Sequence, residues 1–578
     1  MPEYWADRLK KLKAMGLNTV ETYVAWNLHE QVKENFKFKD EVDIVKFVNL
    51  AQELGLHVII RPGPYICSEW DLGGLPSWLL NDPNMRLRST YGPFMEAVEK
   101  YFSKLFALLT PLQFSRGGPI IAWQVENEYA SVQEEVDNHY MELLHKLMLK
   151  NGATELLFTS DDVGYTKRYP IKLDGGKYMS FNKWFCLFLH FQPDKPIMVT
   201  EYWSGWFDHW GEKHHVLNTE RKMINEVKDI LDMGASINFY MFHGGTNFGF
   251  MNGANTAGNR IDDGYQPDVT SYDYDAPLSE AGDITPKYKA LRKLIQEHVP
   301  GEFLPDPLPD IPPNLQKAAY DNIHMKDFVP LQKIYKYIDQ AIDIAAVTPM
   351  EFLPINNNGG QGYGFTIYQT TLKHHAKSLT IEKIRDRAHV SFLYKSNADV
   401  VDEIVFTVNP KDSDDDVFLE IMVENMGRVN FGKGLHSQRK GILGQVLIDG
   451  HTQNKWKVYP LDFHKTFTER AFLEVSWSKP TEGASFSPGF YRGILHIQGQ
   501  PRDSFVHPKG WGKGVCLVNG KNLGRYWKLG PQEALYLPAS WLRSGDNTII
   551  LFEVDGAKDD GILEFSDSPM LGNDIQEQ

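Results

Sequence analysis

The chain has 578 residues, of which 42% are hydrophobic and 23% charged, and its formal net charge is −15. This length exceeds one ordinary core and predicts a globular protein of several domains. The negative charge disfavours a nucleic acid or an anionic membrane as the main partner, because both attract a basic face. The three cysteines Cys67, Cys186 and Cys516 stand far apart, so they indicate neither a disulfide framework nor a zinc site.

The first half of the chain alternates helical patterns with short apolar runs, which is typical of βα units around a parallel sheet. An opening helix is indicated by Trp5, Leu9 and Leu12, which share one face ahead of Gly16. We expect strands at Thr19–Trp26, His57–Gly63, Ile120–Glu128, Leu156–Asp161, Tyr178–Trp184, Ile197–Trp203 and Ile237–Thr246. The pattern predicts an α/β fold, a (β/α)₈ TIM barrel over residues 1–297.

The barrel is expected to lack its first strand. Every helix of such a barrel follows a strand, whereas this sequence opens on a helix. A barrel without one strand has two open sheet edges and a slot in its wall. We therefore expect an upstream strand to be missing and the polypeptide as written to be poorly stable.

A proline-rich stretch follows the barrel. Between His298 and Gln316 the prolines are Pro300, Pro305, Pro307, Pro309, Pro312 and Pro313. This composition predicts an extended linker over residues 298–329. Beyond it, short alternating strands separated by Gly, Asn and Asp predict two all-β sandwich or jelly-roll domains, at 330–450 and 451–570. The acidic tail after Gly556 is weakly patterned and is expected to be frayed.

Two glutamates stand where apolar strands end. The run from Ile120 ends in Glu126-Asn127-Glu128, and the run from Ile197 ends at Glu201. Parallel barrels hold their catalytic groups at the carboxyl ends of strands, so the side chains of Glu128 and Glu201 can face each other. Glycoside hydrolysis needs such a pair, one carboxyl group as acid and the other as nucleophile. Either glutamate alone is more often a solvated or salt-bridged rim residue.

Longer motifs surround these glutamates. They are Thr22–Glu30, Arg61–Trp70, Gly73–Leu79, Gln124–Tyr129, Glu201–Trp206, Tyr240–Phe248 and Thr270–Pro277, followed in the β domains by Val423–Asn430 and Val518–Trp527. Over nearly its whole length the chain resembles glycoside hydrolase family 35, in particular the animal lysosomal β-galactosidase-like proteins. The resemblance implies a retaining exo-β-galactosidase that removes terminal β-D-galactose.

The resemblance also implies roles for individual residues. Glu128 would be the acid/base and Glu201 the nucleophile. Galactose would be bound by Tyr23, by the Cys67–Ser68 backbone, and by Glu69, Asn127 and Tyr274, beside an aromatic wall of Trp203, Trp206, Tyr240 and Tyr272. The aromatic residues Trp26, Trp70, Phe242 and Phe248 are expected to pack beneath the barrel mouth. A buried Glu69 would need a cationic or hydrogen-bonding partner.

Three departures from the family pattern bear on this transfer. Ala25 stands where the family usually has proline, and Ala130 stands where a glycine usually follows the Glu-Asn-Glu-Tyr run. The first strand of the barrel is also absent. Ala130 would strain the backbone beside Glu128 if its φ were positive.

Two other functions remain open. One is a different exo-β-glycosidase, acting on glucosaminides or glucosides, because the carboxylate pair does not identify the sugar. The other is a catalytically silent galactoside-binding protein. The second β domain also admits a galactose-binding role, although similar sandwiches often only brace a barrel. Partners are expected to be galactose-terminated glycans, with no nucleic acid, membrane span, metal or other cofactor. The resemblance implies a lysosomal, vacuolar or extracellular location.

Overall fold

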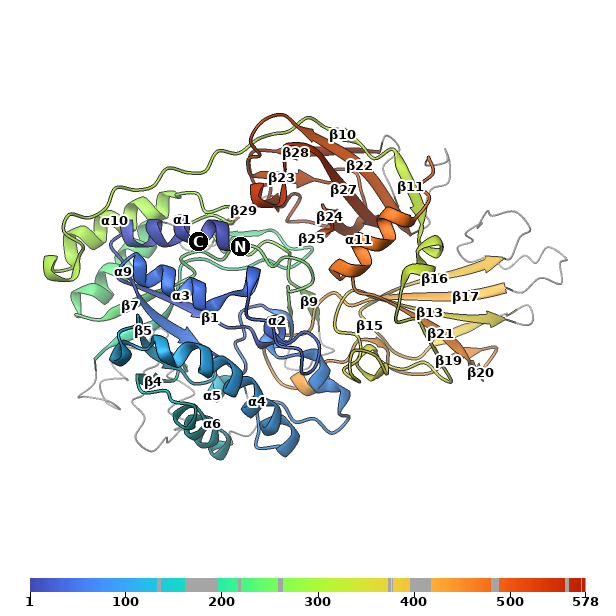
Figure 1. Cartoon of the computed structure of the whole chain (residues 1–578), viewed down its shortest axis with the longest axis horizontal. Coiled ribbons are helices and arrows are strands. Elements are labelled where there is room, and N and C mark those ends of the chain that lie inside the picture. The colour runs from blue at the N-terminus through green and yellow to red at the C-terminus, as the bar shows by residue number, and fades with distance from the viewer. Residues whose placement is uncertain are drawn as a thin grey trace.

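The computed structural model describes residues 1–132, 137–161, 196–216, 220–257, 264–372, 376, 378–394, 417–479, 488–556, 561–572 and 574–576. These residues form an α/β part, coloured blue to green in Figure 1, and two all-β units, coloured yellow and orange to red. Within these ranges, no helix is both long and apolar enough to cross a membrane.

The α/β part is the parallel architecture of the predicted TIM barrel. Its elements are α1 Pro2–Ala14, β1 Thr19–Tyr23, α2 Trp26–His29, α3 Ile44–Glu53, β2 His57–Arg61, α4 Gly92–Leu109, β3 Ile120–Gln124, α5 Tyr129–Val132, α6 Asn138–Lys150, β4 Leu156–Phe158, β5 Met198–Trp203, β6 His214–Val216, α9 Glu220–Asp232, β7 Ser236–Tyr240, β8 Ala254–Thr256, β9 Tyr265–Pro267 and α10 Pro286–His298. Strands pair in parallel in the order β1-β2-β3-β4, and β5 pairs in parallel with β7. The candidate strand Tyr178–Trp184 lies outside the described residues.

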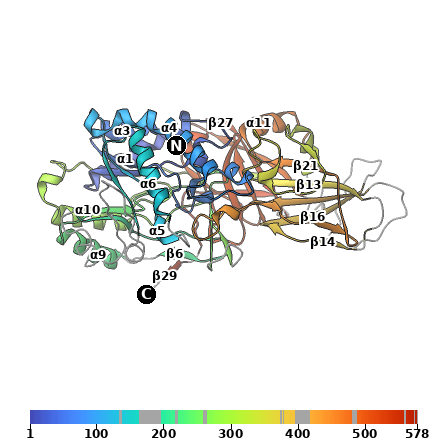
Figure 2. The same cartoon turned by 90° about the horizontal axis from the view of Figure 1, so that it is seen from below.

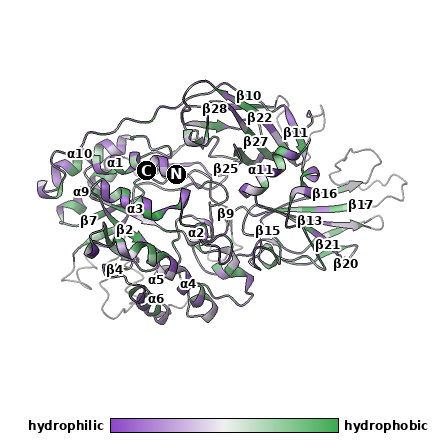
Figure 3. Ribbon diagram, in the orientation of Figure 1, coloured by the Kyte–Doolittle hydropathy of each residue, from purple (hydrophilic) through white to green (hydrophobic). Residues whose placement is uncertain are grey.

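Apolar periodicity explains why these segments form these elements. In α1 the side chains of Leu9 and Leu12 are buried, and Gly16 follows the helix with a φ of 101°. In β2 the fully buried Val58 and Ile60 alternate along the strand and pack into the same core as the α4 face. Figure 3 shows hydrophobic residues along these strands and on the inner faces of the helices.

The barrel wall is open between β1 and β7. Among the described residues these two strands do not pair with each other. A cavity of about 760 Å³ lies between them, lined also by α1 and by the end of α10. Glu21 on β1 and Asn238 on β7 nevertheless contact each other through a hydrogen bond across this gap. The cavity lies in the barrel wall and does not include Glu128 or Glu201 in its lining.

The first all-β unit contains strands β12 to β21. They are β12 Ile342–Ile344, β13 Phe365–Leu372, β14 Leu379–Ile381, β15 Ile384–Arg385, β16 Arg387–Tyr394, β17 Val417–Glu424, β18 Gly441–Ile442, β19 Val446–Ile448, β20 His451–Thr452 and β21 Trp456–Leu461. Its main antiparallel sheet has the order β12-β21-β13-β17-β16. Seen from below in Figure 2, this unit extends away from the barrel.

The second all-β unit follows α11 Lys465–Glu474 but also includes two earlier strands. Its strands are β10 Ile323–His324, β11 Asp327–Pro330, β22 Gly489–Ile497, β23 Ser504–His507, β24 Lys513–Val518, β25 Lys521–Trp527, β26 Leu535–Leu537, β27 Gly545–Glu553 and β28 Ile562–Ser566. Two sheets result, with orders β11-β22-β27-β24-β25 and β10-β28-β23-β26. The short strand β29 Asp574–Gln576 instead pairs with β6 of the α/β part.

Strand pairing differs from three details of the sequence prediction. The proposed boundary at 450 and 451 separates β21 from the sheet in which it pairs with β13. The proposed linker at 298–329 contains β10 and most of β11, although Figure 1 shows an extended segment ahead of them. The tail after Gly556 is not frayed throughout, because Leu563 and Phe565 of β28 pack into the core of the second all-β unit. Pairing between segments distant in sequence causes all three differences.

Candidate active site

The two predicted catalytic glutamates lie near the end of β4, Glu128 just after β3 and Glu201 in β5. The backbone N–H of Glu128 donates to the carbonyl of Ser160, just beyond β4, at 2.9 Å. The Ser160 hydroxyl contacts the Thr200 hydroxyl at 2.9 Å, and Thr200 precedes Glu201 in β5. Burial, and next the negative charge of Glu201, raise the pKa of Glu128. This environment favours the protonated form of Glu128.

Arg61, the last residue of β2, joins Glu201 to the rest of the site. Its Nη2 atom donates to Glu201 Oε1 at 2.5 Å and also to Asn127 Oδ1. The guanidinium lies 4.3 Å from the ring centroid of Tyr23 and pairs more loosely with Glu21. Arg61 is 2% exposed, so its charge acts on these carboxylates with little screening by water. The sequence analysis assigned Arg61 no role.

The segment Glu126-Asn127-Glu128 turns sharply after β3. Glu126 and Glu128 have φ values of 62° and 44°, which end the strand at Gln124, earlier than predicted. Asn127 Oδ1 accepts a second hydrogen bond from Gln124 Nε2 at 2.9 Å. Ala130 lies within helix α5 and is not among the residues with positive φ, so the strain considered for an alanine there does not arise.

A buried ion pair between Arg88 and Glu126 stabilises this turn. Arg88 donates to both carboxylate oxygens of Glu126, at 2.9 and 2.7 Å, and to the carbonyl of Asn127 at 2.7 Å. Tyr140 donates to Glu126 Oε1 at 3.1 Å. Both charged side chains are fully buried. Glu126 is therefore a support for the turn, and the sequence analysis did not identify this function.

We expect Arg88→Met to reduce the free energy of unfolding by about 3–5 kcal/mol, because it leaves the Glu126 charge buried without its partner. Urea unfolding followed by tryptophan fluorescence measures the change. Lys150→Met is the matched control, since Lys150 pairs with Glu99 on the surface and both side chains are more than half exposed. Equal stabilities of the two variants would contradict a supporting role for Arg88.

The predicted sugar-binding loop has an unusual backbone. Cys67, Ser68 and Glu69 have consecutive φ values of 58°, 66° and 48°. This left-handed region is unfavourable for non-glycine residues, and buried residues that adopt it concentrate at functional sites. Tyr272 donates a hydrogen bond to Glu69 Oε2, which meets the expectation that a buried Glu69 needs a partner. Burial raises the pKa of Glu69 to about 7, against the opposing effect of that hydrogen bond.

The predicted aromatic residues form one continuous surface. Ring centroids lie 5.0 Å apart for Trp203 and Trp206, 6.4 Å for Trp206 and Tyr274, 5.3 Å for Tyr272 and Tyr274, and 5.7 Å for Tyr240 and Tyr274. Tyr23 donates to the hydroxyl of Tyr240 at 3.1 Å. Trp203 is 38% exposed and contacts Glu201 Oε2 through Nε1 at 3.4 Å. The surface thus runs from the buried carboxylates to solvent.

The aromatic residues expected to be supports are separate from this surface. Trp26 is fully buried and stacks on Tyr101 at 4.8 Å. Trp70 donates from Nε1 to Asn27 Oδ1 at 2.8 Å, and Phe242 and Phe248 pack near Tyr288 and Trp541 respectively. Cys67 is a buried free thiol whose pKa burial raises well above its ordinary value, which suits packing better than nucleophilic chemistry.

The chain is similar to known protein families and to several known proteins. Residues 1–298 match the profile "Glycosyl hydrolases family 35", residues 349–462 match "Beta-galactosidase, first all-beta domain", and residues 488–547 match "Beta-galactosidase, galactose-binding domain". The chain is 44% identical to beta-galactosidase-1-like protein 2 of Homo sapiens, over 99% of this chain and 87% of that protein. It is 36% identical to beta-galactosidase of Bos taurus, over 98% of this chain and 89% of that protein. A solved beta-galactosidase from Rahnella sp. R3 aligns with 12% identity and a TM-score of 0.37, over 51% of this chain and 53% of that one.

Proposed function

The chain belongs to family 35 of the glycosyl hydrolases, and on that premise we propose that it removes terminal β-D-galactose from galactosides by retaining double displacement. The observation that carries this proposal is the pairing of two unlike carboxyl groups. Glu128 has a raised pKa, whereas Glu201 is ion-paired with Arg61 at 2.5 Å. Retaining hydrolysis requires one proton donor and one ionised nucleophile.

In the first step the ionised carboxylate of Glu201 attacks the anomeric carbon of the bound galactose. The bond to the leaving oxygen breaks, and protonated Glu128 transfers its proton to that oxygen. Arg61 holds the Glu201 carboxylate in position through its hydrogen bond until the bond to the sugar forms. The product of this step is a galactosyl ester of Glu201 and the free alcohol.

The second step follows from the same electrostatics. Once esterified, Glu201 carries no charge, so its contribution to the raised pKa of Glu128 disappears. The pKa of Glu128 falls, and its carboxylate becomes a better base. Glu128 then takes a proton from water as that water attacks the anomeric carbon and releases Glu201. The sugar leaves with its original β configuration.

The residues around the pair would orient galactose. Asn127 uses Oδ1 to accept from Arg61 and Gln124, so its Nδ2 would donate to the sugar 2-hydroxyl. Glu69 and the Cys67–Ser68 backbone would bind the remaining hydroxyl groups, together with Tyr23 and Tyr274. Trp203, Trp206, Tyr240 and Tyr272 would pack against the apolar face of the ring.

A lysosomal, vacuolar or extracellular location is part of the same proposal. An acidic compartment would keep Glu128 protonated with a wide margin, given its raised pKa. Galactose-terminated glycans would be the substrates there.

The proposal predicts that the chain hydrolyses a nitrophenyl β-galactoside with β-galactose as the first product, observed by proton NMR before mutarotation. We expect β-glucosides and β-glucosaminides to react at least about tenfold more slowly in kcat/KM, because hydroxyl-binding sites discriminate strongly. Initial formation of α-galactose would refute the retaining mechanism. Faster hydrolysis of either other sugar would assign a different exo-β-glycosidase, and galactose binding without turnover would assign a silent binding protein.

A further inference from the structure

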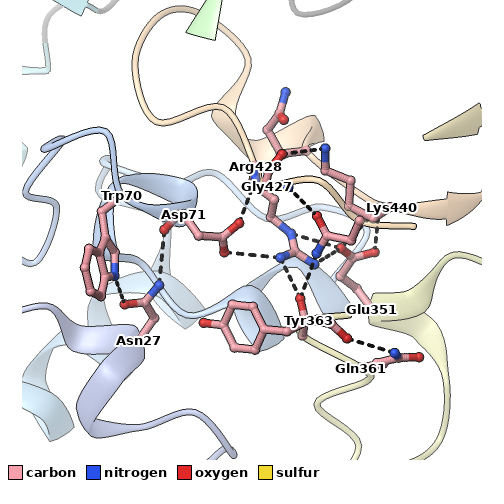
Figure 4. Close-up of polar contacts among 12 residues, drawn as sticks. Asn27, Trp70, Asp71, Glu351, Gln361, Tyr363, Gly427, Arg428 and Lys440 are labelled. Carbon is pink, nitrogen blue, oxygen red and sulfur yellow. Dashed lines mark hydrogen bonds and ion pairs between the residues drawn. The ribbon is translucent and has the colours of Figure 1, made fainter. Parts of the chain in front are cut away.

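A network of buried charges joins the candidate sugar site to the first all-β unit. Arg428 lies between two carboxylates, at 3.2 Å from Asp71 Oδ2 and 2.6 Å from Glu351 Oε1 (Figure 4). All three side chains are fully buried. The backbone N–H of Arg428 also donates to Asp71 Oδ1 at 2.6 Å. Asp71 belongs to the barrel loop that carries Glu69, whereas Arg428 follows β17 of the all-β unit.

The segment Gly427–Asn430 lies directly against this loop. The hydroxyl of Tyr65 donates to the carbonyl of Asn430 at 2.5 Å, and Cys67 Sγ contacts Asn430 Oδ1 at 3.2 Å. On its other side, Asn430 Nδ2 donates to the carbonyl of Ala254 at 2.9 Å. Neighbouring Gly253 donates its N–H to the carbonyl of Glu69 at 2.8 Å. The segment therefore contacts the loop near both of its ends, at Tyr65 and Asp71. It also contacts Ala254, whose neighbour Gly253 bonds to Glu69 in the middle of the loop.

Close packing leaves this loop little freedom to adjust. A Cβ atom placed on Gly73 would lie 2.1 Å from the ring of Tyr65 and 3.1 Å from the carbonyl of Asn430. The left-handed residues Cys67, Ser68 and Glu69 lie between these contacts. That conformation is unfavourable without external restraint, and contacts from the all-β unit lie on both sides of it, beside those that Gly253 and Tyr272 of the barrel make with Glu69.

We propose that Arg428 and Asn430 are positioning residues, through which the first all-β unit sets the geometry of Cys67, Ser68 and Glu69 for sugar binding. The proposal rests on the proposed galactosidase function for its catalytic consequence. The all-β unit is then part of the sugar site as well as a neighbour of the barrel. Neither residue needs to touch the sugar, because each acts through the loop.

The test compares Asn430→Ala and Arg428→Lys with Lys513→Gln in the full chain. Asn430→Ala leaves every buried ion pair of the network intact, whereas Arg428→Lys keeps the charge but cannot bridge both carboxylates as a guanidinium does. Lys513→Gln is the matched control, because Lys513 forms an equally buried pair with Glu424 that does not contact the loop. Thermal midpoints, KM and kcat for a nitrophenyl β-galactoside, the inhibition constant of galactose, and hydrogen exchange of residues 65–74 are measured for all three.

We expect both loop-facing variants to raise KM and the galactose inhibition constant, with kcat/KM reduced by about tenfold to a hundredfold, as for small misplacements of binding groups. Amide exchange should become faster in residues 65–74. Lys513→Gln should lower only the thermal midpoint. Lower midpoints with unchanged KM, inhibition constant and exchange in Asn430→Ala and Arg428→Lys would overturn the proposal. If the unmodified chain lacks galactosidase activity, the proposed function fails, while the exchange comparison still decides whether these residues hold the loop.

Discussion

Glu201→Gln is expected to reduce kcat on the order of 10⁴-fold or more, the scale of losses seen when a covalent nucleophile is removed. Glutamine has the shape of glutamate but no negative charge, so it cannot form the galactosyl ester. It can still accept a hydrogen bond from Arg61, whose contact with Glu201 is made at 2.5 Å. Steady-state hydrolysis of a nitrophenyl β-galactoside measures the loss.

Galactose affinity separates chemistry from binding in the same variant. We expect Glu201→Gln to bind galactose with nearly unchanged affinity in calorimetry, because the loop and the aromatic surface are intact. Glu226→Gln is a suitable control. Glu226 lies in helix α9, outside the site, and accepts a hydrogen bond at 2.7 Å from Tyr202, the residue after Glu201 in β5. Substantial turnover by purified Glu201→Gln would exclude this residue as the nucleophile.

Glu128→Gln is expected to reduce kcat/KM by about 10²–10⁴-fold for galactosides with alkyl leaving groups, the usual contribution of a general acid. For dinitrophenyl galactoside the rate of the first step should fall much less, because its leaving group departs without a proton. Azide should then accelerate turnover of this substrate and yield β-galactosyl azide, since it attacks the ester without a general base. A uniform loss across leaving groups, without azide rescue, would argue against Glu128 as the acid/base.

The pH profile follows from the same assignment. Because burial and Glu201 raise the pKa of Glu128, the acid form needed for the first step is present below that pKa and is lost as the pH rises through it. The alkaline limb of kcat/KM should therefore disappear in Glu128→Gln when dinitrophenyl galactoside is the substrate.

Local patterns were sufficient to predict most of the barrel. The expected strands at His57–Gly63 and Ile197–Trp203 correspond to β2 and β5, because runs of buried side chains end there in both cases. The expected end of β3 was too late, because the chain turns at Glu126, which has a positive φ and whose carboxylate pairs with Arg88. Chain periodicity carries no information about such a partner.

The candidate site was less accessible from sequence. The ends of apolar strands indicated the two glutamates, and the family resemblance supplied their roles and the aromatic surface, but Arg61 and Arg88 were given no function. The available signal for Arg61 was its place as a charged residue at the carboxyl end of the apolar run Val58–Ile60. The contact of Cys67 with Asn430 spans 363 positions, and only the folded arrangement of barrel and all-β unit reveals it.

The interleaved strands also have a consequence for biosynthesis. Asp327 in β11 pairs opposite Arg492 in β22, and Ile323 in β10 pairs opposite Leu563 in β28. The first all-β unit lies between these partners in the chain. It therefore emerges complete from the ribosome before the later strands of the second all-β unit have been synthesised. Helix α1 also lacks one of its partners until Asp503 has been synthesised, because Tyr4 donates a hydrogen bond to Asp503 at 2.5 Å. A nascent chain stopped before β28 would thus leave strand β10 without its partner, and one stopped before Asp503 would also leave helix α1 without this contact.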